Sequence, residues 1–192
     1  MTNKIQEANL AMVVSKTFSG LNVNALRYLL PLWIAPLTGV TFRCVFAAVA
    51  FWIIGYWAKP ETASVKDKIY LFLLGAVGIY GYMFSYLMGL SKTTPVSAAI
   101  FTSMQPIWVF ILSVFFFNEK ATVMKIVGIL VGLGGALLCI STQKSDDLAS
   151  DAFSGNLFCL VSSVIYAVYL ILSNRFLRRT GPYTLMRYTF SG

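Results

Sequence analysis

The residues of this sequence that could do chemistry are few, and most of them lie inside strongly apolar segments. One group falls in the stretch SKTFSGLNVNALR, residues 15–27. At 3.6 residues per helical turn, Lys16, Gly20, Asn24 and Arg27 share one face, and apolar side chains occupy the opposite face. These groups bind solutes through charge and hydrogen bonds, and none of them forms a nucleophile–base pair. The pattern therefore favours a binding surface over a catalytic centre.

Two interpretations of this polar face remain open. A charged group that faces hydrocarbon costs at least about 2.5–3.5 kcal/mol on insertion scales, so the face should turn toward protein or water. Alternatively, the long stems of Lys16 and Arg27 let their charges reach the two membrane interfaces. Asn24 is too short to do so, which favours the inward orientation. Asn22 lies off this face, and its role is the least defined.

Arg43 is a second chemically capable residue, within the next apolar segment. Its guanidinium could bind a carboxylate or another anion as a bidentate donor. The alternative is a structural role, in which it binds lipid headgroups or the carbonyls at a helix end.

The pair Gln105-Pro106 interrupts a later apolar segment. Pro106 cannot donate to the carbonyl of Thr102, and its ring crowds that turn, so we expect a kink in the helix. Thr102 and Gln105 share a face of small and polar residues. Broken helices often line transporter sites, although proline is also frequent in ordinary membrane helices.

Two further sets of residues could serve helix packing and not solute binding. Tyr82 could pack against a substrate ring or hydrogen-bond between helices. Gly128, Gly132 and Gly135 give one helix a flat face, which predicts close helix packing.

Several kinds of chemistry have no residues to support them. The sequence has no histidine, and no Asp or Glu falls inside the apolar segments. It has no Gly-rich phosphate loop with a lysine and no cysteine spacing typical of metal sites. We therefore predict no enzyme activity, no metal and no cofactor, and no proton-coupling group in this part of the protein.

The composition indicates a membrane protein. Of 192 residues, 58% are hydrophobic and only 11% are charged, whereas about a quarter of the residues of a soluble domain are charged. The net charge of +8 comes from short basic clusters between apolar segments, not from a basic stripe with interleaved aromatics. This distribution predicts a lipid bilayer as partner and no nucleic acid.

The hydrophobic pattern predicts an all-α integral membrane bundle with six full spans and the start of a seventh,. Lys and Arg concentrate on one side of these spans, which places the N-terminus in the cytoplasm. We expect a multi-pass protein of the plasma membrane, the inner membrane if the source is bacterial. The expected spans are Leu10–Leu30, Pro36–Trp57, Ile69–Leu90, Ser97–Phe117, Val123–Ile140 and Asn156–Leu177, with the last beginning near Pro182.

A faint internal repeat connects the two ends of the sequence. Residues 9–15 resemble residues 156–162, and Pro36 with Arg43 is echoed by Pro182 with Arg187. Both matches have an offset of about 145 residues, or five spans, so the second copy would cross the membrane in the opposite sense. Chance similarity between apolar segments is the alternative.

This repeat divides the chain into a first five-helix repeat, an inter-repeat loop and the truncated start of a second repeat. The partner that we expect for it is a missing C-terminal repeat of the same protein. The three parts cover residues 1–144, 145–155 and 156–192.

An ordered set of short patterns resembles the EamA-type domains of the drug/metabolite transporter superfamily. The chain departs from the family pattern in that about four helices are missing and Ser19 stands where an aromatic residue is usual; Arg27 also replaces the usual lysine. The patterns are Gly20 to Asn22 with Arg27, Pro36 with Arg43, Thr94 to Ile100, Gln105-Pro106, Asn118-Glu119-Lys120 and Gly128.

The resemblance implies a ten-helix carrier made of two inverted five-helix repeats, with a central cavity and alternating access. It predicts a secondary transporter of small metabolites, amino-acid-like or otherwise polar or amphipathic. The competing hypothesis is a membrane scaffold that transports nothing. The substrate, the coupling ion, the direction of transport and the oligomeric state are left open.

Overall fold

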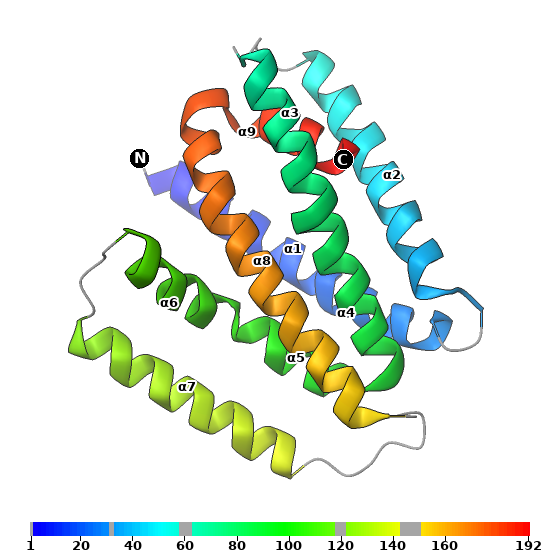
Figure 1. Cartoon of the computed structure of the whole chain (residues 1–192), viewed down its shortest axis with the longest axis vertical. Coiled ribbons are helices and arrows are strands. Elements are labelled where there is room, and N and C mark those ends of the chain that lie inside the picture. The colour runs from blue at the N-terminus through cyan, green and yellow to red at the C-terminus, as the bar shows by residue number, and fades with distance from the viewer. Residues whose placement is uncertain (1, 31–32, 58–62, 118–121, 143–150) are drawn as a thin grey trace.

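The computed structural model describes residues 2–30, 33–57, 63–117, 122–142 and 151–192, without the side chains of residues 2–5, 8, 27, 117, 137, 139 and 140. All regular structure in these ranges is helical (Figure 1). The helices are α1 (Thr2–Leu29), α2 (Pro36–Trp57), α3 (Val65–Leu74), the π-helix η1 (Gly75–Tyr80), α4 (Gly81–Lys92), α5 (Pro95–Ser103), α6 (Gln105–Phe117), α7 (Val123–Ser141), α8 (Ala152–Thr180) and α9 (Pro182–Ser191).

Within the described residues, 4 helical segments are long and apolar enough to cross a membrane. Helix α1 has the length, but its polar residues keep it outside this group. Helix α7 (Val123–Ser141) is assessed only over Val123–Ala136, because the side chains of residues 137, 139 and 140 lie outside the described ones. The count of six full spans thus stays a prediction for α1 and α7. The 4 segments are Pro36–Trp57, Val65–Lys92, Pro95–Phe116 and Ala152–Thr180.

The third apolar segment is continuous from α3 to α4 but contains the π-helical turn η1. Its glycines allow close contact with other helices. A Cβ added at Gly75 would collide with the Thr189 carbonyl of α9, and one at Gly78 would meet Tyr169 of α8. Single π-helical turns inside α-helices occur frequently at functional sites.

The fourth apolar segment is interrupted between α5 and α6. Helix α5 begins after Thr94, whose side chain accepts a hydrogen bond of 3.1 Å from the backbone N–H of Ser97 and thereby caps the helix,. It ends at Ser103, and Pro106 is the second residue of α6. A proline is tolerated there, because the first turn of a helix has no intrahelical acceptor for its N–H groups. Figure 1 shows the break between α5 and α6.

Helix α8 lies at the centre of the bundle and packs on α4, α5 and α6 (Figure 1). Its contact with α4 is close because Gly89 and Gly155 face the opposite backbone. A Cβ at Gly89 would lie 2.8 Å from the Gly155 carbonyl oxygen. Asp151 caps the start of α8 by accepting from Ser154 N–H at 3.1 Å. The helix ends at Thr180 and is capped by Gly181, whose φ of 83° suits glycine,.

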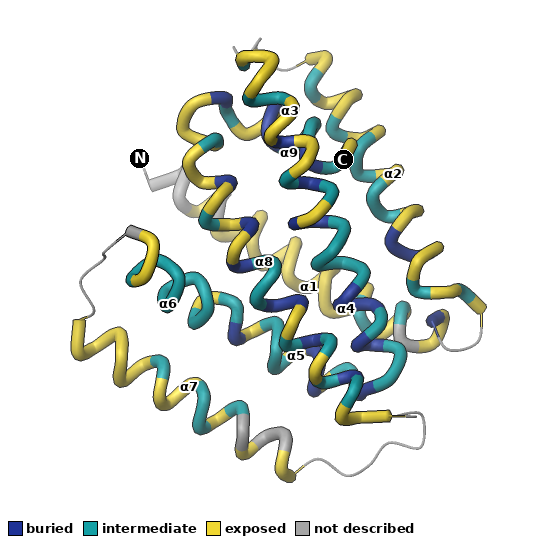
Figure 2. Tube along the Cα trace, viewed as in Figure 1, coloured by how far each residue is buried: buried dark blue, intermediate teal, exposed yellow. Residues whose placement is uncertain are grey.

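Buried residues concentrate where α4, α5 and α8 meet, whereas α1 and α7 are exposed along most of their length (Figure 2). Many exposed side chains are large and apolar, such as Phe46 and Phe116. In a membrane these surfaces can contact lipid without cost. The main buried cluster comprises Leu30, Val40, Tyr86, Leu87, Leu90, Ala98 and Cys159.

Candidate functional site

Polar side chains from four helices line one small cavity, here called the α1–α4 cavity. Its volume is about 220 Å³. It includes four residues that the sequence singles out as binding candidates. The lining residues are Ser19, Gly20, Asn22, Val23, Arg43, Tyr82, Met83, Tyr86, Ala99 and Thr102.

On α1, the residues that face this cavity are Ser19, Gly20, Asn22 and Val23. The helical wheel placed Asn24 on the inward face, but Asn24 is exposed and its Nδ2 donates to the Gly20 carbonyl in its own helix at 3.1 Å. Lys16 is also exposed. Asn22 is exposed as well, but it lines the cavity together with Gly20, whereas Lys16 and Asn24 do not. The side chain of Arg27 lies outside the described residues.

Arg43 of α2 brings the positive charge to the cavity. Its side chain is half-buried, and the lining contains no carboxylate that could neutralise it. A half-buried guanidinium without a lining carboxylate can accept an anion from outside the protein, and a planar carboxylate fits it in a bidentate manner. The arrangement suits binding of an anionic group.

A row of tyrosines forms the wall between α4 and α8. The ring centroids of Tyr82 and Tyr166 lie 4.6 Å apart, those of Tyr82 and Tyr86 lie 6.1 Å apart, and those of Tyr166 and Tyr169 lie 5.9 Å apart. Tyr82 and Tyr86 line the cavity, whereas Tyr166 and Tyr169 stack behind them. The row supplies a rigid aromatic surface with polar hydroxyl groups.

Gln105, the first residue of α6, lies close to the phenol of Tyr82 at this wall. Its Nε2 is buried and has no hydrogen-bond partner. A buried donor without a partner costs about 1–3 kcal/mol, so such groups commonly serve a ligand or a water. Thr102 is less available, because its hydroxyl donates to the Ala98 carbonyl at 2.6 Å.

The residues of the cavity suit noncovalent binding. No group of three or more His, Cys, Asp or Glu side chains that could hold a metal ion occurs within the described ranges. The cavity offers a guanidinium, amides, hydroxyls and aromatic rings, which orient a solute without breaking its bonds.

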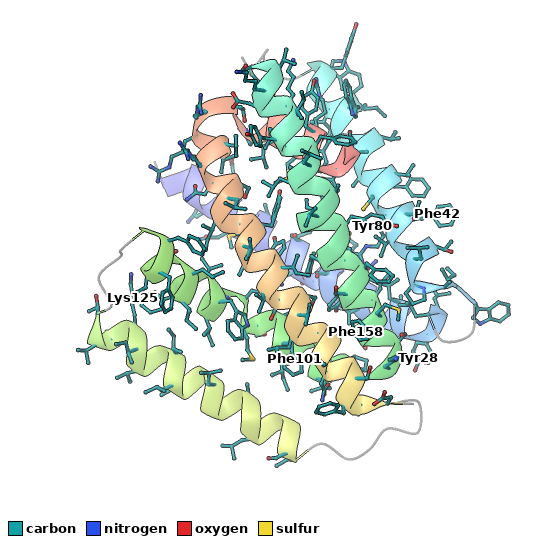
Figure 3. The ribbon with its side chains drawn as sticks, viewed as in Figure 1. Tyr28, Phe42, Tyr80, Phe101, Lys125 and Phe158 are labelled. Carbon is teal, nitrogen blue, oxygen red and sulfur yellow. The ribbon has the colours of Figure 1, made fainter. Side chains whose placement is uncertain are left out.

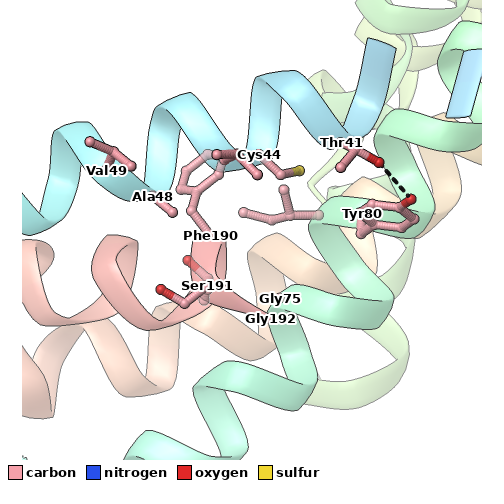
Figure 4. A pocket seen from close by; sticks show the side chains of 12 residues that line it. Thr41, Cys44, Ala48, Val49, Gly75, Tyr80, Phe190, Ser191 and Gly192 are labelled. Atoms are coloured by element: carbon pink, nitrogen blue, oxygen red, sulfur yellow. Dashed lines mark hydrogen bonds between the residues drawn. The ribbon is translucent and has the colours of Figure 1, made fainter. Parts of the chain in front are cut away.

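A second cavity, of about 400 Å³, lies between α2, η1 and the end of α9 (Figure 4). Its lining is mostly apolar. Its polar pair, Thr41 and Tyr80, is joined by a hydrogen bond of 3.3 Å between the two hydroxyls. In Figure 3, Tyr80 lies between α2 and α4, whereas Phe42 points away from the bundle. This cavity has fewer groups for recognising a solute than the α1–α4 cavity.

The glycine face of α7 has little packed against it in this chain. A Cβ at Gly128 or Gly135 would meet open space, and one at Gly132 would meet only Ile107, at 3.6 Å. The close glycine contacts occur instead at Gly89 and Gly155, between α4 and α8. Close packing on α7 stays a prediction.

The fold and the cavity define a multi-pass α-helical membrane protein. The chain belongs to the EamA-like transporter family, whose model matches residues 6–141. The match covers the helices that contribute every residue of the α1–α4 cavity.

Comparisons with individual proteins agree with this membership. The chain is 26% identical, over 90% of its length and 57% of the relative's, to YyaM of Bacillus subtilis (strain 168), which is named an uncharacterized transporter. It is 28% identical, over 54% of its length and 37% of the relative's, to YddG of Ancylobacter novellus, which is named an aromatic amino acid exporter. The chain thus spans less than two thirds of the length of these relatives.

A solved crystal structure has the same fold. It superposes with a TM-score of 0.57 over 93% of this chain and 64% of its own, at 19% identity. Together, these comparisons agree with membership of the EamA-like transporter family, several of whose relatives are named transporters.

Sequence reasoning missed two parts of this site. Tyr166 contributes through its stacking on Tyr82, which depends on the pairing of α4 with α8. Ser19 lines the cavity although the helical wheel did not select it. Its spacing of three residues from Asn22 was the available signal, because residues three apart share a helical face.

Proposed function

We propose that the protein is a secondary transporter that binds small amphipathic solutes bearing a carboxylate in the α1–α4 cavity. The observation that carries this proposal is the convergence of Asn22, Arg43, Tyr82 and Thr102, from four helices, on one cavity without a carboxylate. Its volume of about 220 Å³ lies below the roughly 300–1,000 Å³ of pockets for drug-sized ligands. A solute of the size of an amino acid suits such a space.

Each group has a distinct part in this binding. The guanidinium of Arg43 holds the carboxylate of the solute. Tyr82 and Tyr86 pack against its apolar or aromatic body. Asn22 binds its remaining polar groups. The Ancylobacter relative's name, an aromatic amino acid exporter, supports an amino-acid-like solute.

Transport requires that this cavity open to each side of the membrane in turn. We place the protein in the plasma membrane with its N-terminus in the cytoplasm, and we infer an inverted-repeat carrier that works by alternating access. The solute gradient or exchange drives transport through this part of the protein, because its membrane-crossing segments carry no histidine and no acidic residue except Asp67 in the first turn of α3.

The proposal is tested by uptake into proteoliposomes containing the whole protein as the cell makes it. Radiolabelled amino acids and their methyl esters are compared. The wild-type protein should prefer the acids, and Arg43→Gln should abolish this preference while lowering uptake of the acids at least tenfold. Arg43→Lys should retain part of it.

A scaffold that transports nothing predicts a different result. It predicts no uptake of any solute, and no reaction of water-soluble thiol reagents with cysteines placed at Asn22, Thr102 or Gln105. Preference for acids over esters that survives in Arg43→Gln would remove the proposed role of Arg43.

A further inference from the structure

A third cavity, separate from the α1–α4 cavity, lies between α6 and α8. This α6–α8 cavity has a volume of about 660 Å³ and shares no lining residue with the proposed solute site. Its lining residues are Val109, Ser113, Leu170, Ile171, Asn174, Arg175 and Arg178.

The lining changes from apolar to cationic along the cavity. On α8, Leu170 and Ile171 are followed on the same helical face by Asn174, Arg175 and Arg178,. At 1.5 Å per residue, Leu170 and Arg178 are about 12 Å apart along the helix.

Helix α6 shows the same change from apolar to polar. Val109 precedes Ser113 by one turn, and α6 runs in the same direction as α8 (Figure 1). The polar ends of both walls therefore lie at the same end of the cavity. An occupant with one charged end and one apolar end matches this gradient.

The charge at the polar end is positive. Arg175 and Arg178 are both exposed, and no carboxylate is among the lining residues. The helix dipole stabilises cations in the last turn of α8. This effect explains the presence of Arg178 and of Arg179 equally well. The dipole does not explain why Arg175 and Arg178 line a cavity whose other end is apolar, whereas Arg179 does not line it.

We propose that the α6–α8 cavity binds an anionic phospholipid. Its phosphate lies between Arg175 and Arg178, with Asn174 and Ser113 as further hydrogen-bond partners, and the start of an acyl chain lies along Leu170, Ile171 and Val109. Basic pockets between membrane helices bind anionic headgroups in this manner. The arginines lie at the end of a membrane span, the level at which lipid phosphates are found. The bound lipid joins α6 to α8.

The test is binding of dioleoyl phosphatidylglycerol to the whole purified protein in detergent, measured by native mass spectrometry without any transport assay. Dioleoyl phosphatidylcholine is the neutral comparison. An arginine near the membrane surface contributes about fivefold to binding of an anionic lipid. Arg175→Gln with Arg178→Gln should therefore weaken binding of phosphatidylglycerol roughly 25-fold, to the level of phosphatidylcholine.

Arg179→Gln is the matched control, because it removes the same charge from the same turn outside the cavity lining. It should retain binding within about twofold. Ile171→Trp, which fills the apolar end without changing the charge, should weaken binding about as much as one arginine substitution. Circular dichroism checks that each variant keeps its helicity.

Three results would overturn the proposal. If Arg178→Gln and Arg179→Gln lost phosphatidylglycerol binding equally, the lipid would be attracted to the basic surface in general and not to the cavity. Equal binding of the two lipids would remove the role of charge. Displacement of phosphatidylglycerol by sn-glycerol 3-phosphate at equal concentration would assign the cavity to a free phosphate ester.

Discussion

The phenol ring of Tyr82 on α4 lies 4.6 Å from that of Tyr166 on α8, centroid to centroid, with the two planes tilted by 38°. Tyr82 faces the α1–α4 cavity, so this contact connects the cavity wall to the central helix of the bundle. A movement of α8 relative to α4 would therefore displace a ring that lines the proposed solute site.

Replacing Tyr166 with leucine should weaken this connection. Loss of an aromatic pair costs about 0.5–1.5 kcal/mol beyond the area that it buries. We expect Tyr166→Leu to lower both the unfolding temperature in detergent and the affinity for solute, and Tyr166→Phe to keep most of both. Tyr28, which is 73% exposed, provides the control substitution Tyr28→Leu, with little expected effect. Equal effects at Tyr28 and Tyr166 would contradict the role of the stacked pair.

Two asparagines on α1 provide a matched test of its inward face. Asn22 lines the cavity, whereas Asn24 donates to its own helix. Asn22→Ala should reduce solute affinity about tenfold, the typical effect of removing a polar partner from a bound group, and Asn24→Ala should leave it within about twofold. Uptake kinetics measure the solute affinity of both variants. A larger loss in Asn24→Ala than in Asn22→Ala would mean that the face indicated by the helical wheel is the inward one.

Gln105 should show opposite effects on stability and on transport. Its Nε2 is buried without a partner, so Gln105→Leu should raise the free energy of unfolding by about 1 kcal/mol and reduce uptake of solute. The exposed neighbour Ser103 is the control, since Ser103→Ala should change stability by less than about 0.5 kcal/mol. Unfolding in a graded denaturant series measures both variants. Lower stability in Gln105→Leu would mean that the amide has a partner.

The contact between α4 and α8 should be sensitive to a single methyl group. A Cβ at Gly89 would lie 2.8 Å from the Gly155 carbonyl oxygen and 2.9 Å from the Cys159 nitrogen, both of which are backbone atoms. Gly89→Ala should therefore destabilise the protein by about 1–3 kcal/mol. Gly81→Ala, on the same helix but with nothing within 4 Å of its Cβ, should stabilise it by about 0.5–1 kcal/mol. Similar unfolding temperatures for the two variants would argue against close packing.

The acidic residues of the described ranges should not couple transport to protons. They are Glu7, Asp67 and Asp151, and the last two lie in the first turn of α3 and at the cap of α8. The combined variant Glu7→Gln, Asp67→Asn, Asp151→Asn should keep the pH profile of uptake between about pH 6 and 8, because asparagine caps a helix about as well as aspartate. A lost pH dependence would place the coupling group in this part of the protein.

Four of the residues that the sequence selects as binding candidates line the α1–α4 cavity, and their role in binding stays a prediction. Arg43, Tyr82 and Thr102 stand out because polar groups are costly within apolar segments and tend to face the interior. The inward face of α1 could not be derived in this way. Lys16 and Asn24 satisfy a helical wheel, but the rotation of α1 depends on its packing against other helices.

The turn η1 and the stacking of Tyr166 were also beyond the sequence. The π-helical turn brings Gly75 and Gly78 against Thr189 and Tyr169, which are remote in sequence. Such contacts depend on which helices become neighbours, and hydrophobic periodicity does not contain that information. The apolar segments themselves were predictable, because their length and composition follow from the thickness of a bilayer.

The turn η1 also changes how far α3 is rotated relative to α4 about the axis of the third apolar segment. A π-helical turn accommodates about one residue more than an α-helical turn, and one residue corresponds to about 100° of rotation. Deleting a single residue between Gly75 and Tyr80 would restore regular α-helix and turn α3 by that angle relative to α4. Tyr82 could then keep its place only if α3 gave up its contacts with α9. Deleting one residue would thus rotate the surface that contacts α9 relative to the surface that carries Tyr82. A substitution alters only one of these two surfaces.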